Sequence, residues 1–81
     1  MKIRVLGSEG TLASANAVGN AKLVRVYNSG ASDLVLTHKT GSTVIGTMTV
    51  PSKAIELVKK LPAETLEGGA ALKAVNVAYS H

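Results

Sequence analysis

Apolar and polar residues alternate in the stretch 22–39, in two runs separated by a polar segment. Successive side chains of a β-strand point to opposite faces, so this alternation predicts strands with one buried and one exposed face. In the first run, Val24 and Val26 fall on one face, and Arg25 and Tyr27 fall on the other. We therefore expect this run to bury its valines and to expose its arginine and tyrosine.

The second run continues the pattern, with Leu34 and Leu36 on one face and Val35 on the other. The intervening residues 28–33, NSGASD, are typical of a turn. Glycine reaches positive φ at no steric cost, and asparagine hydrogen-bonds to its own backbone. The two runs are therefore predicted to form a β-hairpin that turns through Gly30.

Four further segments have the composition or the alternation of strands, and they span residues 2–6, 43–50, 54–60 and 72–79. In the first of them Ile3 and Val5 are expected to face inward. In the last, Val75 and Val77 share a face. Gly46 lies inside a strand pattern, which indicates a bulge or a close approach of another backbone.

Residues 54–60 admit two interpretations. As a strand, the segment turns Ile55 and Leu57 inward and Val58 outward. As a helix capped by Ser52, it places Ile55 and Val58 on one apolar stripe. The strand is favoured, because seven residues are few for a helix and the segment follows a strand and a turn.

Two stretches, 7–20 and 61–69, contain few bulky apolar residues and several turn formers. The first is predicted to be an extended loop or a weak edge strand, held to the core by Leu12 and Val18. The second is predicted to be a corner that begins near Pro62. Whether residues 7–20 contain an additional strand stays open.

These elements predict one all-β domain over residues 1–81, a small antiparallel β-sandwich or partly open barrel of about six strands. The sequence has no Phe or Trp, and its apolar residues are mainly Val, Leu and Ala. Small branched side chains suit a thin sandwich. The chain has no cysteine, which excludes a disulfide scaffold. At 81 residues the core is small, so we expect a homo-oligomer or a domain docked on a larger assembly.

The formal net charge is +4, with +3 in residues 1–40 and +1 in residues 41–81. This spread is too even to define a basic stripe, so it is weak evidence for nucleic-acid binding. No run of residues has the apolar length of a signal peptide or a membrane-spanning helix. A membrane partner is therefore not expected.

The residues offer little catalytic chemistry. His38 and His81 lack carboxylates or cysteines at metal-ligand spacing. A triad of Asp33, His38 and a serine lacks any local signature of a nucleophile. The glycines of residues 41–47 are spaced as in a phosphate loop, but the lysine that should follow is absent. We predict that the protein is not an enzyme and has no catalytic, cofactor-binding or metal-binding residue.

One group of residues is a candidate for partner contact. Arg25 and Tyr27 share the outer face of the predicted hairpin with Lys22 and Lys39. Arginine and tyrosine are enriched at protein interfaces and also serve on nucleic-acid-binding sheets. The alternative is an ordinary solvated strand face. Lys59 and Lys60 are better explained as charges that protect a strand edge than as a phosphate site.

Several short motifs resemble small virion proteins of tailed, marine-type bacteriophages. They are residues 20–30 (NAKLVRVYNSG), 45–51 (IGTMTVP) and 74–79 (AVNVAY), with similar order and spacing over nearly the whole chain. The segment that follows Pro51 departs from the pattern, because a glycine-containing turn is expected there. The family has no catalytic residues to transfer.

This resemblance implies a small β-sandwich that acts as a capsid decoration, or cement, protein and stabilises the outer capsid shell. Its partner would be the major capsid protein or another virion protein, which it would meet as a homo-oligomer or in many lattice copies. It would be made in the host cytoplasm and located on the capsid surface of the virion.

Two alternatives stay open. The first is a small basic nucleic-acid-binding β-barrel, against which the scarcity of aromatic residues argues. The second is a tail or neck adaptor or a fibre-associated module of the same virion. The sequence does not identify the partner surface, the number of subunits or the position in the particle.

Overall fold

The computed structural model describes residues 2–80, so His81, for which no metal or catalytic role is predicted, lies outside the described residues. Within that range there is no helix, and hence none long and apolar enough to cross a membrane. The eight strands are β1 (Lys2–Val5), β2 (Gly10–Leu12), β3 (Leu23–Asn28), β4 (Leu34–Thr40), β5 (Thr43–Val50), β6 (Ile55–Lys59), β7 (Thr65–Glu67) and β8 (Gly69–Ser80).

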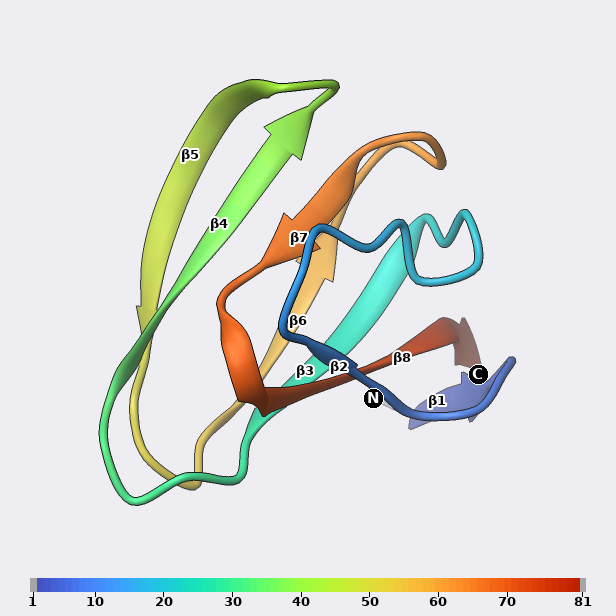
Figure 1. Ribbon diagram of the computed structural model, residues 1–81. Helices are drawn as coiled ribbons and strands as arrows, with labels where there is room; N and C mark the ends of the chain where they lie inside the picture. Colours follow the sequence, from blue (N-terminus) through green and yellow to red (C-terminus); the bar gives the residue numbers. More distant parts are fainter. Residues whose placement is uncertain (1, 81) are drawn as a thin grey trace.

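The strands form two antiparallel sheets (Figure 1). The first sheet has the order β1-β8-β3-β6, and β2 also pairs with β8. The second sheet has the order β5-β4-β7. The protein is therefore all-β, as predicted, and its two open sheets are arranged as a small sandwich.

The predicted hairpin is wrong, because β3 and β4 belong to different sheets. β3 pairs with β6 and β8, whereas β4 pairs with β5 and β7. The connection 29–33 therefore crosses from one sheet to the other, and 51–54 crosses back (Figure 1). A strand that is buried on one face shows the same alternation whichever strand it pairs with, so the pattern located the strands but not their partners.

The long hairpin of the molecule is instead β4–β5, which turns at Gly41 with φ of 59°. Its ladder shifts register, so that Val44 pairs with Lys39 and Gly46 pairs with His38. Ile45 is left without a partner on β4, which places a bulge beside the glycine for which one was predicted.

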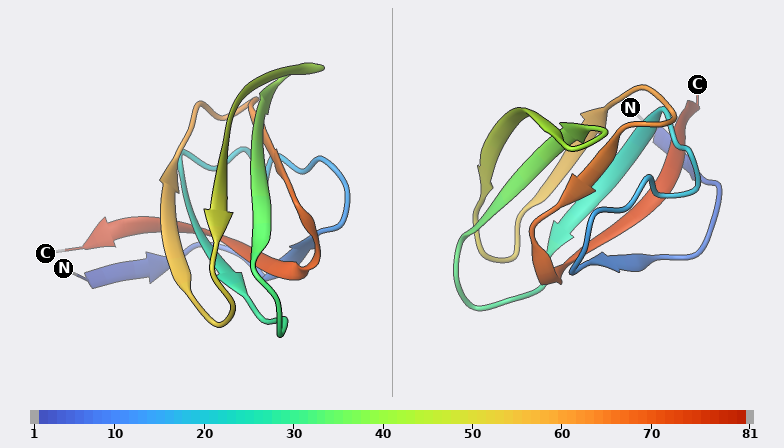
Figure 2. Two further views of the ribbon diagram at one scale, coloured as in Figure 1. Left: turned by 90° about the vertical axis from the view of Figure 1, so that its left-hand side faces the viewer. Right: turned by 45° about the horizontal axis from the view of Figure 1, so that its top comes forward.

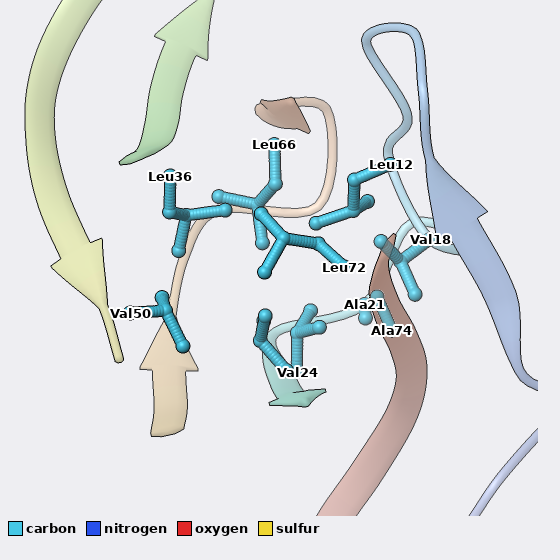
Figure 3. Packing of buried hydrophobic residues seen from close by; sticks show 10 residues of the cluster. Leu12, Val18, Ala21, Val24, Leu36, Val50, Leu66, Leu72 and Ala74 are labelled. Atoms are coloured by element: carbon cyan, nitrogen blue, oxygen red, sulfur yellow. The ribbon is translucent and has the colours of Figure 1, made fainter. Parts of the chain in front are cut away.

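The main core lies between the two sheets (Figure 3). It contains Leu12 and Val18, which confirms that both residues anchor the stretch 7–20. That stretch also contributes the short strand β2. The other buried members of this core are Ala21, Val24, Val26, Leu36, Val50, Leu66, Leu72 and Ala74.

A second apolar cluster lies on the opposite face of the first sheet. It consists of Leu23, Val75 and Val77, with Ile3 and Leu57 packed against it. In β3 and β8 these residues alternate with members of the main core, so the two clusters occupy opposite faces of the same sheet. The first sheet therefore has apolar residues on both faces.

Some predictions for single elements need correction. Residues 55–59 are a strand, as favoured, but Val58 packs against the main core and Ile55 is exposed. Val5 was expected to face inward and is 65% exposed. The predicted corner 61–69 contains the additional strand β7. These differences arise because both faces of the first sheet are apolar, and because a three-residue strand has almost no periodicity to detect.

Candidate interaction surface

Arg25 and Tyr27 lie on the outer face of the first sheet, opposite the buried valines of β3, as predicted. The guanidinium carbon of Arg25 lies 5.9 Å from the centroid of the Tyr27 ring, within the range of a cation–π contact. Arg25 Nη1 also lies 3.5 Å from Glu9 Oε2. Both contacts restrain the arginine on the surface and leave the tyrosine ring beside it.

These two residues border the second apolar cluster, and together they form a larger surface that we call the outer patch. Its centre is Leu23, Val75 and Val77, and exposed apolar residues surround the centre. Cross-strand pairing puts Val5 beside Val77, and Ile3 beside Tyr79. The full outer patch comprises Ile3, Val5, Leu23, Arg25, Tyr27, Ile55, Leu57, Lys59, Lys73, Val75, Val77 and Tyr79.

The exposed end of the outer patch is formed by β1 and the end of β8. Figure 2 (left) shows these two segments running side by side away from the rest of the sandwich. Tyr79 is 54% exposed there. A shallow groove of about 310 Å³ lies beside it, lined by Lys22, Leu23, Lys59, Val77, Ala78 and Tyr79. Lys22, predicted as a contact residue, thus borders the outer patch.

Charge is distributed unequally between the two sheets. The strands of the first sheet carry five basic residues and one acidic residue, a net charge of +4. The strands of the second sheet carry one of each, a net charge of zero. The basic residues of the first sheet are Lys2, Arg4, Arg25, Lys59 and Lys73, and its acidic residue is Glu56. Of these basic residues Arg25, Lys59 and Lys73 belong to the outer patch, where they lie around a buried apolar centre.

Lys39 is not part of this surface. It lies on β4 in the second sheet, where its Nζ donates to Glu67 Oε1 at 2.6 Å. It was grouped with Arg25 and Tyr27 because β3 and β4 were expected to pair. The structure brings Lys22, Arg25 and Tyr27 to one sheet and places Lys39 on the other.

A polar cluster closes the turn between β6 and β7. His38 Nε2 lies 2.9 Å from Glu64 Oε1, and the same oxygen accepts a 2.9 Å hydrogen bond from the Leu61 amide. That backbone bond, with the histidine and the Lys60 charge, lowers the pKa of Glu64. Burial lowers the pKa of Lys60, although Glu64 opposes this, and the Lys60 ammonium donates to the carbonyl of Pro62 at 3.2 Å. Lys60 is buried and does not protect a strand edge.

The structure does not bring Asp33 and His38 together. Asp33 Oδ1 accepts a hydrogen bond from the Ser52 amide at 3.0 Å, whereas His38 is bound to Glu64. Asp33 lies just before β4 and His38 lies within it, five residues apart and so about 16 Å in an extended chain. Among residues 2–80, no three His, Asp or Glu side chains are close enough to hold a metal ion. The glycine-spaced residues 41–47 form the β4–β5 turn and the start of β5.

The apolar part of the outer patch was missed in the sequence, although a signal for it exists. In β3, the apolar Leu23 shares a face with Arg25 and Tyr27. In β8, apolar residues occur on both faces of the strand. Strands that are apolar on both faces are usual where both faces are covered. That pattern indicates that the second face is also a packing surface.

Comparison with protein-family models, with curated proteins and with solved structures finds no match to this chain. The outer patch is broad, it is shallow at the groove beside Tyr79, and it combines apolar side chains with arginine, tyrosine and lysine. Such a surface is suited to contact a macromolecule.

Proposed function

We propose that this chain is a structural protein of a tailed-phage virion that decorates the outer capsid shell and stabilises it. The outer patch is the observation that carries the proposal, because a decoration protein needs a broad surface for another protein. The resemblance of residues 20–30, 45–51 and 74–79 to small phage virion proteins supplies the class of assembly. The all-β sandwich fold is compatible with both.

In this proposal the outer patch lies against the capsid protein. Exposed Val5, Ile55 and Tyr79 would lose their contact with water, and Arg25 and Lys59 would meet carboxylates around the apolar centre. A partner that binds only the folded chain also stabilises it by mass action. A small sandwich with a limited core therefore gains stability when it binds to many copies of such a partner.

The test is binding to purified capsids that lack a decoration protein. Wild-type protein should co-sediment with them and raise the temperature at which they open. Val5→Glu places a carboxylate in the outer patch and should lower the affinity by about tenfold or more, because a charge is desolvated on binding. Val35→Glu is the matched control, since Val35 is 53% exposed on the other sheet. Equal binding by both variants would contradict a role for the outer patch.

One observation also favours the nucleic-acid-binding alternative. Tyr27 and Tyr79, the two aromatic residues of the chain, both lie on the outer patch with Arg25, Lys59 and Lys73. Aromatic and basic side chains on one sheet face are typical of proteins that bind single strands. That function predicts an affinity for oligonucleotides that falls steeply between low and moderate salt. A filter-binding titration without such affinity excludes it.

A further inference from the structure

The strand β5 has an unusual free edge. It runs for eight residues, Thr43–Val50, with the sequence TVIGTMTV, and contains no charged residue. It pairs with β4 on one side only. Among the described residues, the one further hydrogen bond to its backbone is from Asn28 Nδ2 to the Val50 carbonyl, 2.9 Å long. Figure 1 shows β5 at the margin of the molecule with no strand beyond it.

The outer strands β1, β6 and β7 are protected, and β2 is only three residues long. β1 carries Lys2 and Arg4, and β6 carries Lys59. The free side of β7 is covered at Leu66, whose amide and carbonyl each bond to the backbone of Asn16 at 3.0 Å. Charges and covering segments are the usual means by which proteins prevent edge pairing. β5 has neither charged residues nor a covering segment. Beyond its bulge at Ile45, residues 46–50 pair with β4 in regular register.

The edge of β5 is also apolar beside the gap between the sheets. Ile45 is 52% exposed and Met48 is 39% exposed. Both line a groove of about 220 Å³ with Leu36 and Val58, at the side where β5 and β6 do not pair. A strand added next to β5 would therefore satisfy free backbone groups and cover apolar side chains together.

We propose that β5 pairs edge to edge with β5 of a second copy of this chain, antiparallel about a two-fold axis near Thr47. The two second sheets then form one continuous sheet. A second copy fits because the edge is uncharged, so bringing two of them together produces no like-charge repulsion within the strands. The cationic outer patch would repel its own copy, which argues against self-association through that face.

This pairing is independent of the proposed capsid role. β5 belongs to the second sheet and the outer patch to the first, so a dimer leaves the outer patch free for another partner. Loss of the dimer and loss of capsid binding are therefore separate results. Antiparallel pairing about Thr47 places Met48 of each copy opposite Gly46 of the other.

The test is the association state of the purified full-length chain by sedimentation equilibrium over a range of concentrations. Wild type should approach twice the monomer mass as concentration rises. Thr47→Lys places two ammonium groups opposite each other at the axis and should weaken dimerisation by about tenfold or more. Thr37→Lys is the matched control, because Thr37 is the cross-strand neighbour of Thr47 on the inner strand β4, and it should dimerise like wild type.

Amide hydrogen exchange by NMR tests the same contact without any variant. Protection of amides in residues 43–50 should increase with protein concentration, while that of the outer edges of β1 and β6 should not. A wild-type chain that stays monomeric at every concentration overturns the proposal. A dimer with unchanged exchange in β5, or one equally sensitive to Thr47→Lys and Thr37→Lys, overturns it too, because the contact then lies elsewhere.

Discussion

The side-chain amide of Asn28 donates a 2.9 Å hydrogen bond to the carbonyl of Val50, and so joins the first sheet to the second. Both residues are fully buried. The same amide donates to the Ser32 carbonyl, and Asn28 Oδ1 accepts from the Gly30 amide, each at 2.9 Å. One asparagine thus stabilises the crossing out of β3 and the end of β5, where the chain begins to cross back.

Replacing this asparagine should destabilise the fold strongly. Asn28→Ala leaves two carbonyls and one amide without their partner, and we expect a loss of about 2–4 kcal/mol in the free energy of unfolding. Urea denaturation measures it. Asn76→Ala is a suitable control, since the Asn76 side chain makes no hydrogen bond to any described residue. A loss below about 0.5 kcal/mol for Asn28→Ala would contradict this role.

Gly68 is required where β7 leads into β8. A Cβ atom there would lie 2.7 Å from the Val35 carbonyl oxygen and would also overlap Leu72. Backbone cannot move as a flexible side chain does, so Gly68→Ala should cost about 1–3 kcal/mol of stability. Gly7→Ala is the matched control, because a Cβ at Gly7 meets no atom within 4 Å. Equal melting temperatures for the two variants would show that the close approach is absent.

The alternation in residues 22–39 located β3 and β4 well and assigned their faces correctly. It could not show that they pair with other strands, because a hairpin and a crossing between sheets bury the same side chains. The sequence predicts a turn at Asn28 because asparagine bonds to nearby backbone, and its bond to the Gly30 amide is of this kind. Its bond to Val50, 22 residues away in the sequence, has no local signal.

The candidate site was predictable in part, because the pattern of a single strand assigns faces but does not identify neighbouring strands. The position of Arg25 and Tyr27 on an exposed face follows from one strand alone. Including Lys39 depended on the predicted pairing of β3 with β4, and that prediction was wrong. Residues such as Ile55 were assigned to the wrong side because the first sheet is apolar on both faces, so alternation does not identify the face that meets the second sheet.

Acid should weaken the contact between β4 and the turn that precedes β7. The pKa of Glu64 is lowered from its ordinary value of 4.5, chiefly by the Leu61 amide and then by His38 and Lys60. The Glu64 carboxylate therefore takes up a proton more readily in the unfolded chain than in the folded one. The stabilisation that ionised Glu64 gives the fold is present above about pH 4.5, and it is lost as pH falls through the lower pKa of the folded state. Glu64→Gln should reduce the decrease in melting temperature between neutral pH and about pH 3.

The control for that experiment is Glu56→Gln, since the Glu56 carboxylate makes no hydrogen bond or ion pair to the described residues. Its melting temperature should follow that of wild type as pH falls. If Glu64→Gln retained the full wild-type acid sensitivity, the hydrogen bonds to Leu61 and His38 would not be the cause of it.

The most direct test of the central proposal is quantitative mass spectrometry of purified virions of the phage that, in this proposal, encodes the chain. A capsid decoration protein repeats with the symmetric shell, so we expect on the order of hundreds of copies per particle. Absence from the virion would contradict a structural role. On the order of a dozen copies would contradict decoration of the capsid and would indicate a neck or tail position instead.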